Sequence, residues 1–222
     1  MKKIFLLYLS LGLISCSNDI DYTSTYTASK LEKGNIQLFT QRGEIKSTAL
    51  INSFISRYNS WFSTNYGSLT EEFLQRPVKV NFLSTDDAQF ILFANTIAVH
   101  VVTKNNVIYL EAKDTLDTGW RYYEYPSLKP TIYDTMYKYT ELYRDIFKVQ
   151  GVYDTYGIRI KQCYYLTRSG NQLKMPIMNY WYFQSYSTQS WGGINNAFNS
   201  SSIGMLEDKD TLAIQQFQVV FK

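Results

Sequence analysis

Side chains suited to chemistry are scarce in this chain of 222 residues, which has one histidine and two cysteines. A Ser-His-Asp hydrolase would have to be built around His100, and a zinc site with three histidines is impossible. We interpret His100 as a buried histidine that is hydrogen-bonded to backbone or lies beneath a helix. The sequence contains no phosphate-binding loop, dinucleotide-binding turn or calcium loop. It therefore predicts no metal, no cofactor and no enzymatic activity.

Cys163 is the cysteine that lies inside the expected globular region. The neighbouring cations Arg159 and Lys161 favour a thiolate, but nucleophilic catalysis also needs a positioned base. We interpret Cys163 as a small, half-buried residue. Paired carboxylates leave no recognisable spacing in a sequence, so a carbohydrate-active hydrolase that uses two of them is kept as an alternative.

Cys16 closes a short apolar segment near the start of the chain. Lys2 and Lys3 precede an apolar run over residues 4–14, and the sequence Leu13-Ile14-Ser15-Cys16 ends it. The run is far shorter than the ~20 residues needed to span a bilayer. A positive start, an apolar stretch and a small residue before the end are typical of an export signal that is removed.

This segment resembles the lipobox of bacterial lipoprotein precursors. The resemblance implies removal of residues 1–15, attachment of diacylglycerol to Cys16 and acylation of its new amine, for example by palmitate. Two or three acyl chains hold a protein on a membrane, because each buried methylene contributes about 0.8 kcal/mol. Ser17 stands where an inner-membrane lipoprotein would have Asp, and Asp19 and Asp21 resemble the acidic tether of surface lipoproteins. We expect a lipid-anchored outer-membrane protein, at the periplasmic face or on the cell surface.

Composition indicates one β-rich domain. The chain has 22 basic and 19 acidic side chains, and Lys2 and Lys3 leave with the signal, so nucleic acid is not an expected partner. Aromatic residues make up 17% of the chain, with 20 Tyr and only 4 Pro, which favours half-buried pleated sheets. We expect a lipidated cysteine and flexible tether over residues 16–33, followed by a single domain over residues 34–222.

Periodicity predicts one clear helix and a possible second. From Ser47 to residue 62, apolar side chains recur at spacings of three and four, and Ser47 is placed to cap the helix. Ser68 followed by Glu71 has the form of a capping box, and predicts a second helix that ends before Pro77. We expect the first helix to cover a sheet.

Alternating patterns predict strands over most of the rest, joined by short turns. The adjacent residues Asn105 and Asn106 tolerate positive φ and suit a tight hairpin. The strands at 89–94 and 97–103 are apolar on both faces, which favours a cover by the first helix. Strands are expected at residues 35–40, 78–82, 89–94, 97–103, 107–111 and 120–125, and, against a competing helical period, within 132–149.

The C-terminal third indicates a strongly curved sheet. A hairpin is expected between residues 157–167 and 172–184, with Leu166 and Leu173 both facing inward. Leu212 and Ile214 have the opposite phase to Phe217, Val219 and Phe221, which a bulge at residues 215–216 would reconcile. We expect a barrel-like or strongly curved antiparallel sheet with one or two N-terminal helices packed on it, and a two-sheet β-sandwich is the alternative.

Aromatic residues provide the candidate ligand site. The expected loop over residues 184–199 combines Ser, Asn and Gly with aromatic residues, and long loops on a β scaffold often bind ligands. The residues expected to contact a ligand are Trp191, Tyr186, Tyr182 and Phe198.

The expected function is binding rather than catalysis. The layout resembles lipocalin-like lipoproteins and other small outer-membrane lipoproteins, although the lipocalin Gly-x-Trp pattern is replaced here by Gly34-Asn35-Ile36. We expect a binding module for a small apolar ligand, a glycan or a protein partner of the envelope. A structural or accessory subunit of an envelope complex is the second hypothesis, ahead of the hydrolase.

Overall fold

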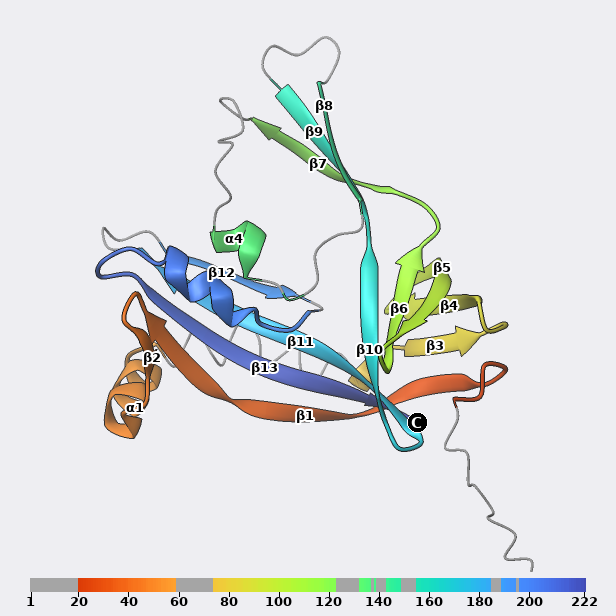
Figure 1. The fold of residues 1–222 in the computed structure, drawn as a ribbon, viewed down its shortest axis with the longest axis horizontal. Coiled ribbons are helices and arrows are strands. Elements are labelled where there is room, and N and C mark those ends of the chain that lie inside the picture. The colour runs from red at the N-terminus through yellow and green to blue at the C-terminus, as the bar shows by residue number, and fades with distance from the viewer. Residues whose placement is uncertain are drawn as a thin grey trace, which may run out of the picture.

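The computed structural model describes residues 20–58, 74–122, 132–136, 138, 143–148, 155–184, 189–194 and 196–222 (Figure 1). Most of the described chain is β-strand, and the helices are short. The helices are α1 (Thr48–Arg57), α4 (Ile132–Thr135) and the 3-10 helix η1 (Ser200–Met205). The strands are β1 (Thr25–Thr40), β2 (Gly43–Ile45), β3 (Val78–Phe82), β4 (Asp87–Leu92), β5 (Asn95–Lys104), β6 (Val107–Ala112), β7 (Leu116–Tyr122), β8 (Tyr143–Lys148), β9 (Thr155–Lys161), β10 (Cys163–Ser169), β11 (Gln172–Phe183), β12 (Gln189–Ile194) and β13 (Thr211–Phe221).

Eight antiparallel strands close into a barrel. The strand order is β10-β6-β5-β4-β3-β1-β13-β11, and β11 pairs again with β10 to complete the ring. The closing contact is short, because it joins only Thr167 with Lys174, Arg168 with Leu173 and Ser169 with Gln172. The expected barrel-like sheet is therefore confirmed, and the alternative sandwich is set aside.

The barrel interior is filled by side chains that alternate along each strand. In β3, Val78, Val80 and Phe82 are buried, whereas Lys79 and Asn81 between them are only half-buried. This period of two directs successive side chains to opposite faces of the sheet, so one face of every strand forms the core. The core cluster consists of Val78, Val80, Phe82, Ala88, Phe90, Val99, Val101, Ile108, Leu110, Tyr164, Leu166, Leu173, Met175, Ile177, Phe217, Val219 and Phe221.

Strand β1 begins earlier than the sequence predicted. It starts at Thr25 and runs to Thr40, and Ile20 and Tyr22 pack against the barrel core ahead of it. A flexible tether was expected over residues 16–33, but residues 25–33 belong to β1, and residues 16–19 lie outside the described residues. Polar residues dominate this segment because its outward face is exposed, while alternate residues such as Tyr26 and Ala28 contact the core.

The apolar residues of β13 switch from one face of the strand to the other because the strand contacts two different apolar clusters. The switch is not caused by a bulge in β13 itself. The pairing of β11 with β13 is uninterrupted from Leu173–Phe221 to Phe183–Thr211. Phe217 faces the barrel core, whereas Leu212 and Ile214 belong to a second cluster on the opposite face of the sheet. The bulge expected at residues 215–216 is therefore absent from β13, and a bulge is found instead in the neighbouring strand β1, opposite Gln216.

The irregularity lies in β1, opposite Gln216. The register passes from Lys33–Phe217 to Ile36–Gln215, so two residues, Gly34 and Asn35, stand opposite Gln216 alone. This two-against-one arrangement is that of a β-bulge, which bends a strand and increases its twist. Beyond the bulge, β1, β13 and β11 continue out of the barrel as an extended sheet, flanked by β2 and β12.

Helix α1 forms where the sequence predicted but covers a different part of the sheet. Ser47 caps it, because its Oγ accepts a hydrogen bond from the backbone N of Leu50 at 3.4 Å. Ile51 and Phe54 pack against a cluster that contains Leu38 and Trp181 on the extended sheet. The helix therefore does not cover the outward face of β4 and β5, where Val102 is 42% exposed. The expected extension to residue 62 and the capping box at residues 68–71 lie outside the described residues.

The middle of the chain forms a separate three-stranded sheet in the order β7-β9-β8, which projects beyond the barrel in Figure 1. Within residues 132–149 the strand expectation holds for β8, but Ile132 to Thr135 form a short helix, so it is wrong there. The single strand expected over residues 157–167 is divided at Gln162 into β9 and β10. The Asn105-Asn106 turn is confirmed, with φ of 51° and 61°.

Candidate binding cleft at the bulge of strand β1

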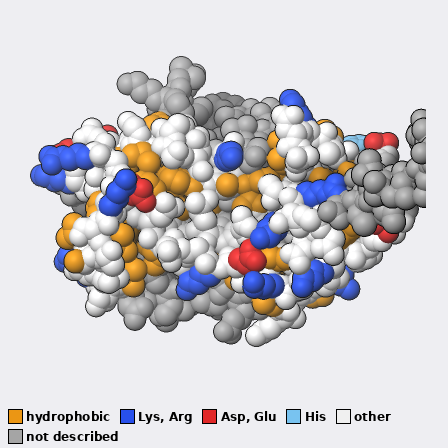
Figure 2. All heavy atoms as spheres, turned by 60° about the horizontal axis from the view of Figure 1, so that its bottom comes forward, with side chains coloured by type: hydrophobic (Ala, Val, Ile, Leu, Met, Phe, Trp, Pro, Cys, Tyr) orange, Lys and Arg blue, Asp and Glu red, His pale blue; other side chains and the backbone are white. Residues whose placement is uncertain are grey.

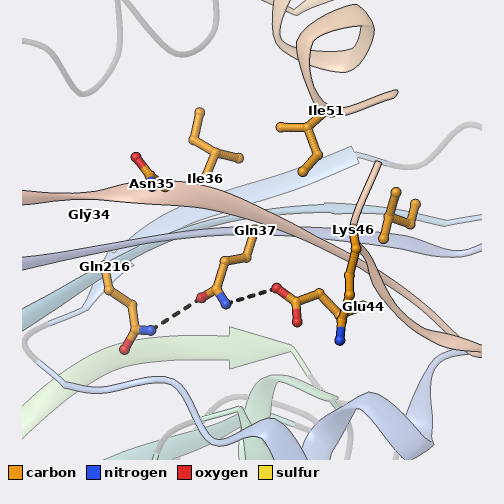
Figure 3. Close-up of a pocket in the computed structure, with 9 residues that line it drawn as sticks. Gly34, Asn35, Ile36, Gln37, Glu44, Lys46, Ile51 and Gln216 are labelled. Atoms are coloured by element: carbon orange, nitrogen blue, oxygen red, sulfur yellow. Dashed lines mark hydrogen bonds between the residues drawn. The ribbon is translucent and has the colours of Figure 1, made fainter. Parts of the chain in front are cut away.

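A cleft of about 480 Å³ opens around the β1 bulge (Figure 3). It is lined by Gly34, Asn35, Ile36, Gln37, Glu44, Ile45, Lys46, Ile51 and Gln216. The lining side chains stand on both sides of the β1 ribbon, with Ile36 and Ile51 on one side and Gln37 and Gln216 on the other. The cleft thus surrounds the edge of a strand and is not a cavity inside the barrel.

This edge of β1 is open among the described strands. On the side away from β13, β1 pairs with β3 through Thr25 to Thr27 and with β2 through Leu38 to Thr40. Residues 28–37 between these two pairings have β13 as their only partner in the described part of the chain. An unpaired edge presents backbone N–H and C=O groups that another extended chain can pair with.

A short series of polar side chains crosses one side of the cleft. Gln216 Nε2 donates to Gln37 Oε1 at 3.4 Å, and Gln37 Nε2 donates to Glu44 Oε1 at 3.2 Å (Figure 3). Gln216 Oε1 also accepts from the backbone N of Phe198 at 3.4 Å. These contacts orient two amide side chains, so the wall of the cleft is held in place before any ligand arrives.

The bulge itself is stabilised from the opposite side. Gln215 is 6% exposed, and its Nε2 donates to the backbone O of Gly34 at 3.2 Å. A Cβ added at Gly34 would lie 2.6 Å from the backbone O of Gln216, so the two strands approach too closely for any other residue. The two glutamines therefore have different roles, since Gln215 supports the backbone and Gln216 lines the cleft.

Charged side chains of β1 lie to one side of the cleft. Glu32 contacts Lys30 at 3.3 Å and Lys174 at 2.8 Å, and hydrogen bonds from Lys174 and then Lys30 lower the pKa of Glu32. Charged residues on an exposed strand discourage unwanted pairing, but in β1 they end at Lys33. Figure 2 shows this side of the molecule, where patches of apolar side chains lie between Lys and Arg side chains.

Two of the four aromatic residues expected to bind a ligand, Tyr182 and Phe198, lie in one apolar cluster. Tyr182 is 5% exposed and lies with Phe198 in the second apolar cluster, where Phe198 packs on Phe39 at 5.1 Å between ring centroids. The Tyr182 hydroxyl donates to Asp210 Oδ2 at 2.7 Å. Tyr182 and Phe198 thus occur together, but as part of a packed cluster.

The other two aromatic residues expected to bind a ligand are Trp191 and Tyr186. Trp191 lies in β12 with its backbone opposite that of Trp181, and Tyr186 lies outside the described residues. The role expected for these four residues in ligand binding stays a prediction. The cleft residues Gln37, Glu44 and Gln216 were missed, although the phase change at residues 215–216 drew attention to one wall of the cleft.

His100 and Cys163 lie in one row across the outside of the barrel. The strand register places Asp87, His100, Glu111 and Cys163 side by side on β4, β5, β6 and β10. His100 Nδ1 is 3.3 Å from Asp87 Oδ1 with its side chain 54% exposed, so the expectation of a buried histidine is wrong. Lys113 Nζ lies 2.7 Å from the same oxygen, and its hydrogen bond is the main cause of a lowered Asp87 pKa.

Cys163 is half-buried, as expected, but its thiol is not activated. Burial, and secondly the charge of Glu111, raise the pKa of Cys163 to about 12. At neutral pH the group is therefore a thiol, which is a poor nucleophile. Across the described ranges, no three His, Cys, Asp or Glu side chains gather closely enough to hold a metal ion. No helix in those ranges is long and apolar enough to cross a membrane.

The fold and the cleft define the class of protein as a closed eight-stranded antiparallel barrel with an extended sheet and an edge cleft. No protein family matches the sequence, and neither a curated protein nor a solved structure is similar enough to be matched.

Proposed function

We propose that this protein is a lipid-anchored envelope protein that binds an extended polypeptide segment of a partner along the open edge of β1. The observation that carries the proposal is the cleft around residues 34–37, where the unpaired edge of the strand coincides with a preformed polar wall. Adding a strand to a sheet edge supplies main-chain hydrogen bonds, and the neighbouring side chains select the sequence. The function requires no catalytic group.

Two other ligand types receive less support. A small apolar ligand of the kind that lipocalin-like proteins carry would need space inside the barrel, and the interior positions hold large side chains such as Phe82, Phe90 and Phe221. A glycan is bound most readily on exposed aromatic rings, and the cleft residues include none. Aliphatic Ile36 and Ile51 with the amides of Gln37 and Gln216 suit a peptide, which has apolar side chains and a polar backbone.

Anchoring at the outer membrane through Cys16 is the second part of the proposal, and it rests on the sequence pattern around Leu13-Ile14-Ser15-Cys16. Replacing Cys16 by Ala removes the thiol that would carry diacylglycerol. We expect the wild-type chain in the membrane fraction and the variant outside it. Retention of the Cys16→Ala variant in the membrane pellet would contradict the anchor.

Peptide binding can be tested with the unlipidated chain, residues 17–222, and a displayed library of random twelve-residue peptides. Selected peptides are expected to slow hydrogen exchange of backbone amides within residues 34–37 when they bind. The variant Asn35→Arg places a bulky charge in the cleft and should weaken binding at least tenfold. Thr96→Arg, at an exposed position on β5, is the matched control and should leave binding unchanged.

Two results would count against this function. Peptides that bind both arginine variants equally well, or that leave exchange at residues 34–37 unaltered, would show that the edge is not the binding site. A small-molecule adduct that co-purifies with the chain in native mass spectrometry would instead favour the carrier hypothesis.

A further inference from the structure

The N-terminal segment of the described chain is fixed across one end of the barrel. Ile20 and Tyr22 pack against the core, and the Tyr22 ring meets that of Phe82 edge-on at 5.3 Å. The Tyr22 hydroxyl lies 3.1 Å from Thr103 Oγ1 on β5. The segment therefore reaches from β3 to β5, and its first residue has a defined place on the barrel.

Local hydrogen bonds hold the turn that follows. Asp21 accepts from the backbone N of Thr23 at 2.9 Å and from the hydroxyls of Thr23 and Ser24. These bonds, led by that from Ser24, lower the pKa of Asp21. The backbone O of Ser24 accepts from the backbone N of Phe82 at 3.2 Å. Asp21, expected to belong to an acidic tether, is thus part of the folded domain.

This segment lies at what we call the turn end of the barrel, formed by residues 20–24, 83–86, 105–106 and 170–171. The register places three hairpin turns there, since Phe82 pairs with Ala88, Lys104 with Val107 and Ser169 with Gln172. The start of β1 and the end of β13 lie at the same end, because Ala28 pairs with Phe221. The opposite end leads into β7 through Ala112.

Only three residues, 17–19, separate the predicted lipid attachment at Cys16 from Ile20, so the two Cα atoms are four residue steps apart. Fully extended, these steps span at most about 14 Å. This length is less than half the ~30 Å thickness of a bilayer's hydrocarbon core. A barrel attached through so short a link cannot turn its other end towards the membrane that holds the lipid.

The side chains at the turn end suit a lipid headgroup region. Leu83 is 57% exposed at the tip of the β3–β4 turn. Lys104 and Lys222 are also exposed at this end, together with the acidic residues Asp21 and Asp86. An exposed aliphatic side chain can enter the headgroup region, and exposed lysines at the same end can contact anionic lipids.

We propose that the turn end of the barrel lies against the surface of the membrane that carries the lipid anchor, and that the short link at residues 17–19 imposes this orientation. The inference rests on the proposed anchoring at Cys16. It also leaves the extended sheet and the β1 cleft pointing away from the headgroups, because β1 leaves the turn end at Thr25 and reaches the bulge at Gly34.

The orientation can be measured with the full lipidated protein in vesicles of phosphatidylethanolamine and phosphatidylglycerol at 3:1. An environment-sensitive fluorophore is attached to Leu83→Cys or to Thr96→Cys, each combined with Cys163→Ser, and spin-labelled lipids serve as the quencher. Thr96 is exposed and lies at the far end of β5, so it is the matched control. We expect quenching at position 83 at least threefold stronger than at position 96.

Lengthening the link between the lipid and the barrel tests whether the short link causes the orientation. Twenty Gly and Ser residues inserted after Asn18 should reduce the quenching at position 83 to the level found at position 96. Equal quenching at the two positions without the spacer, or full quenching at position 83 with it, would overturn the proposal. Both results require protein that floats with the vesicles. A protein that fails to float refutes the anchor instead, so the two failures are distinguishable.

Discussion

Replacing Gly34 by Ala should destabilise the fold, because β1 and β13 approach each other too closely at this residue for a side chain. The new Cβ would lie 2.6 Å from the backbone O of Gln216, about 0.8 Å inside the 3.4 Å at which ordinary contact begins. The obstructing atom belongs to the backbone of a central strand, so a change of rotamer cannot relieve the contact. Either β1 shifts outward or the bulge changes its conformation, and both alter the cleft.

The expected cost can be worked out from two opposing effects. Forcing an extra methyl group into a packed site costs about 1–3 kcal/mol. Replacing glycine restricts the unfolded chain and recovers about 0.4–1 kcal/mol. The midpoints of these two ranges give a net destabilisation of about 1.3 kcal/mol for Gly34→Ala, which corresponds to a fall in melting temperature of roughly 3–5 °C for a domain of this size.

Gly204→Ala is the matched control for this prediction. No atom lies within 4 Å of the Cβ position at Gly204, and its φ is not in the left-handed region, so the substitution should be neutral or slightly stabilising. Urea unfolding of the two variants beside the wild-type chain measures the difference. If Gly34→Ala and Gly204→Ala unfold within 0.5 kcal/mol of each other, the close approach at the bulge is not as described and the argument fails.

Three further predictions concern the clusters around the barrel. Phe54→Ala should lower the free energy of unfolding by about 2 kcal/mol, roughly half the ~3–5 kcal/mol of a fully buried ring, because Phe54 is only partly buried. Leu50→Ala, on the exposed side of the helix, should change it little, and equal melting curves for the two variants would mean that α1 is peripheral. Tyr182→Phe removes the hydroxyl that donates to Asp210 and should cost about 1–3 kcal/mol in chemical denaturation, and an unchanged midpoint would contradict a buried hydrogen bond. Because the pKa of Cys163 is raised to about 12, its alkylation by iodoacetamide should be slow in the native chain at pH 8 and rapid after unfolding, and fast native labelling would refute this burial.

Local signals predicted much of the fold. Ser47 marked the start of α1 because a side-chain oxygen at that point satisfies an otherwise unpaired backbone N–H, which is a short-range effect. The hairpin at Asn105 and Asn106 followed from the tolerance of asparagine for positive φ. The alternation in β3 and β6 showed which side chains face the core.

Features that depend on pairing between residues distant in the sequence were predicted less accurately. The apolar residues of β13 change phase because the strand leaves the barrel and contacts a second cluster on its other face, which no local pattern reveals. The polar start of β1 has the composition of a tether, because its strand character comes from pairing with β13 and β3. The cleft was missed for the same reason, since Gln37 and Gln216 become neighbours only through that pairing.

The position of β13 also affects when the barrel can form during synthesis. This strand lies between β1 and β11, so the first strand of the chain pairs along most of its length with the last. Contacts between distant parts of a sequence form slowly, because a long loop must close before they contribute. The eight-stranded ring therefore stays open until residues 211–221 have emerged. If the chain is exported as proposed, this late closure would keep the barrel unformed while the chain crosses the membrane.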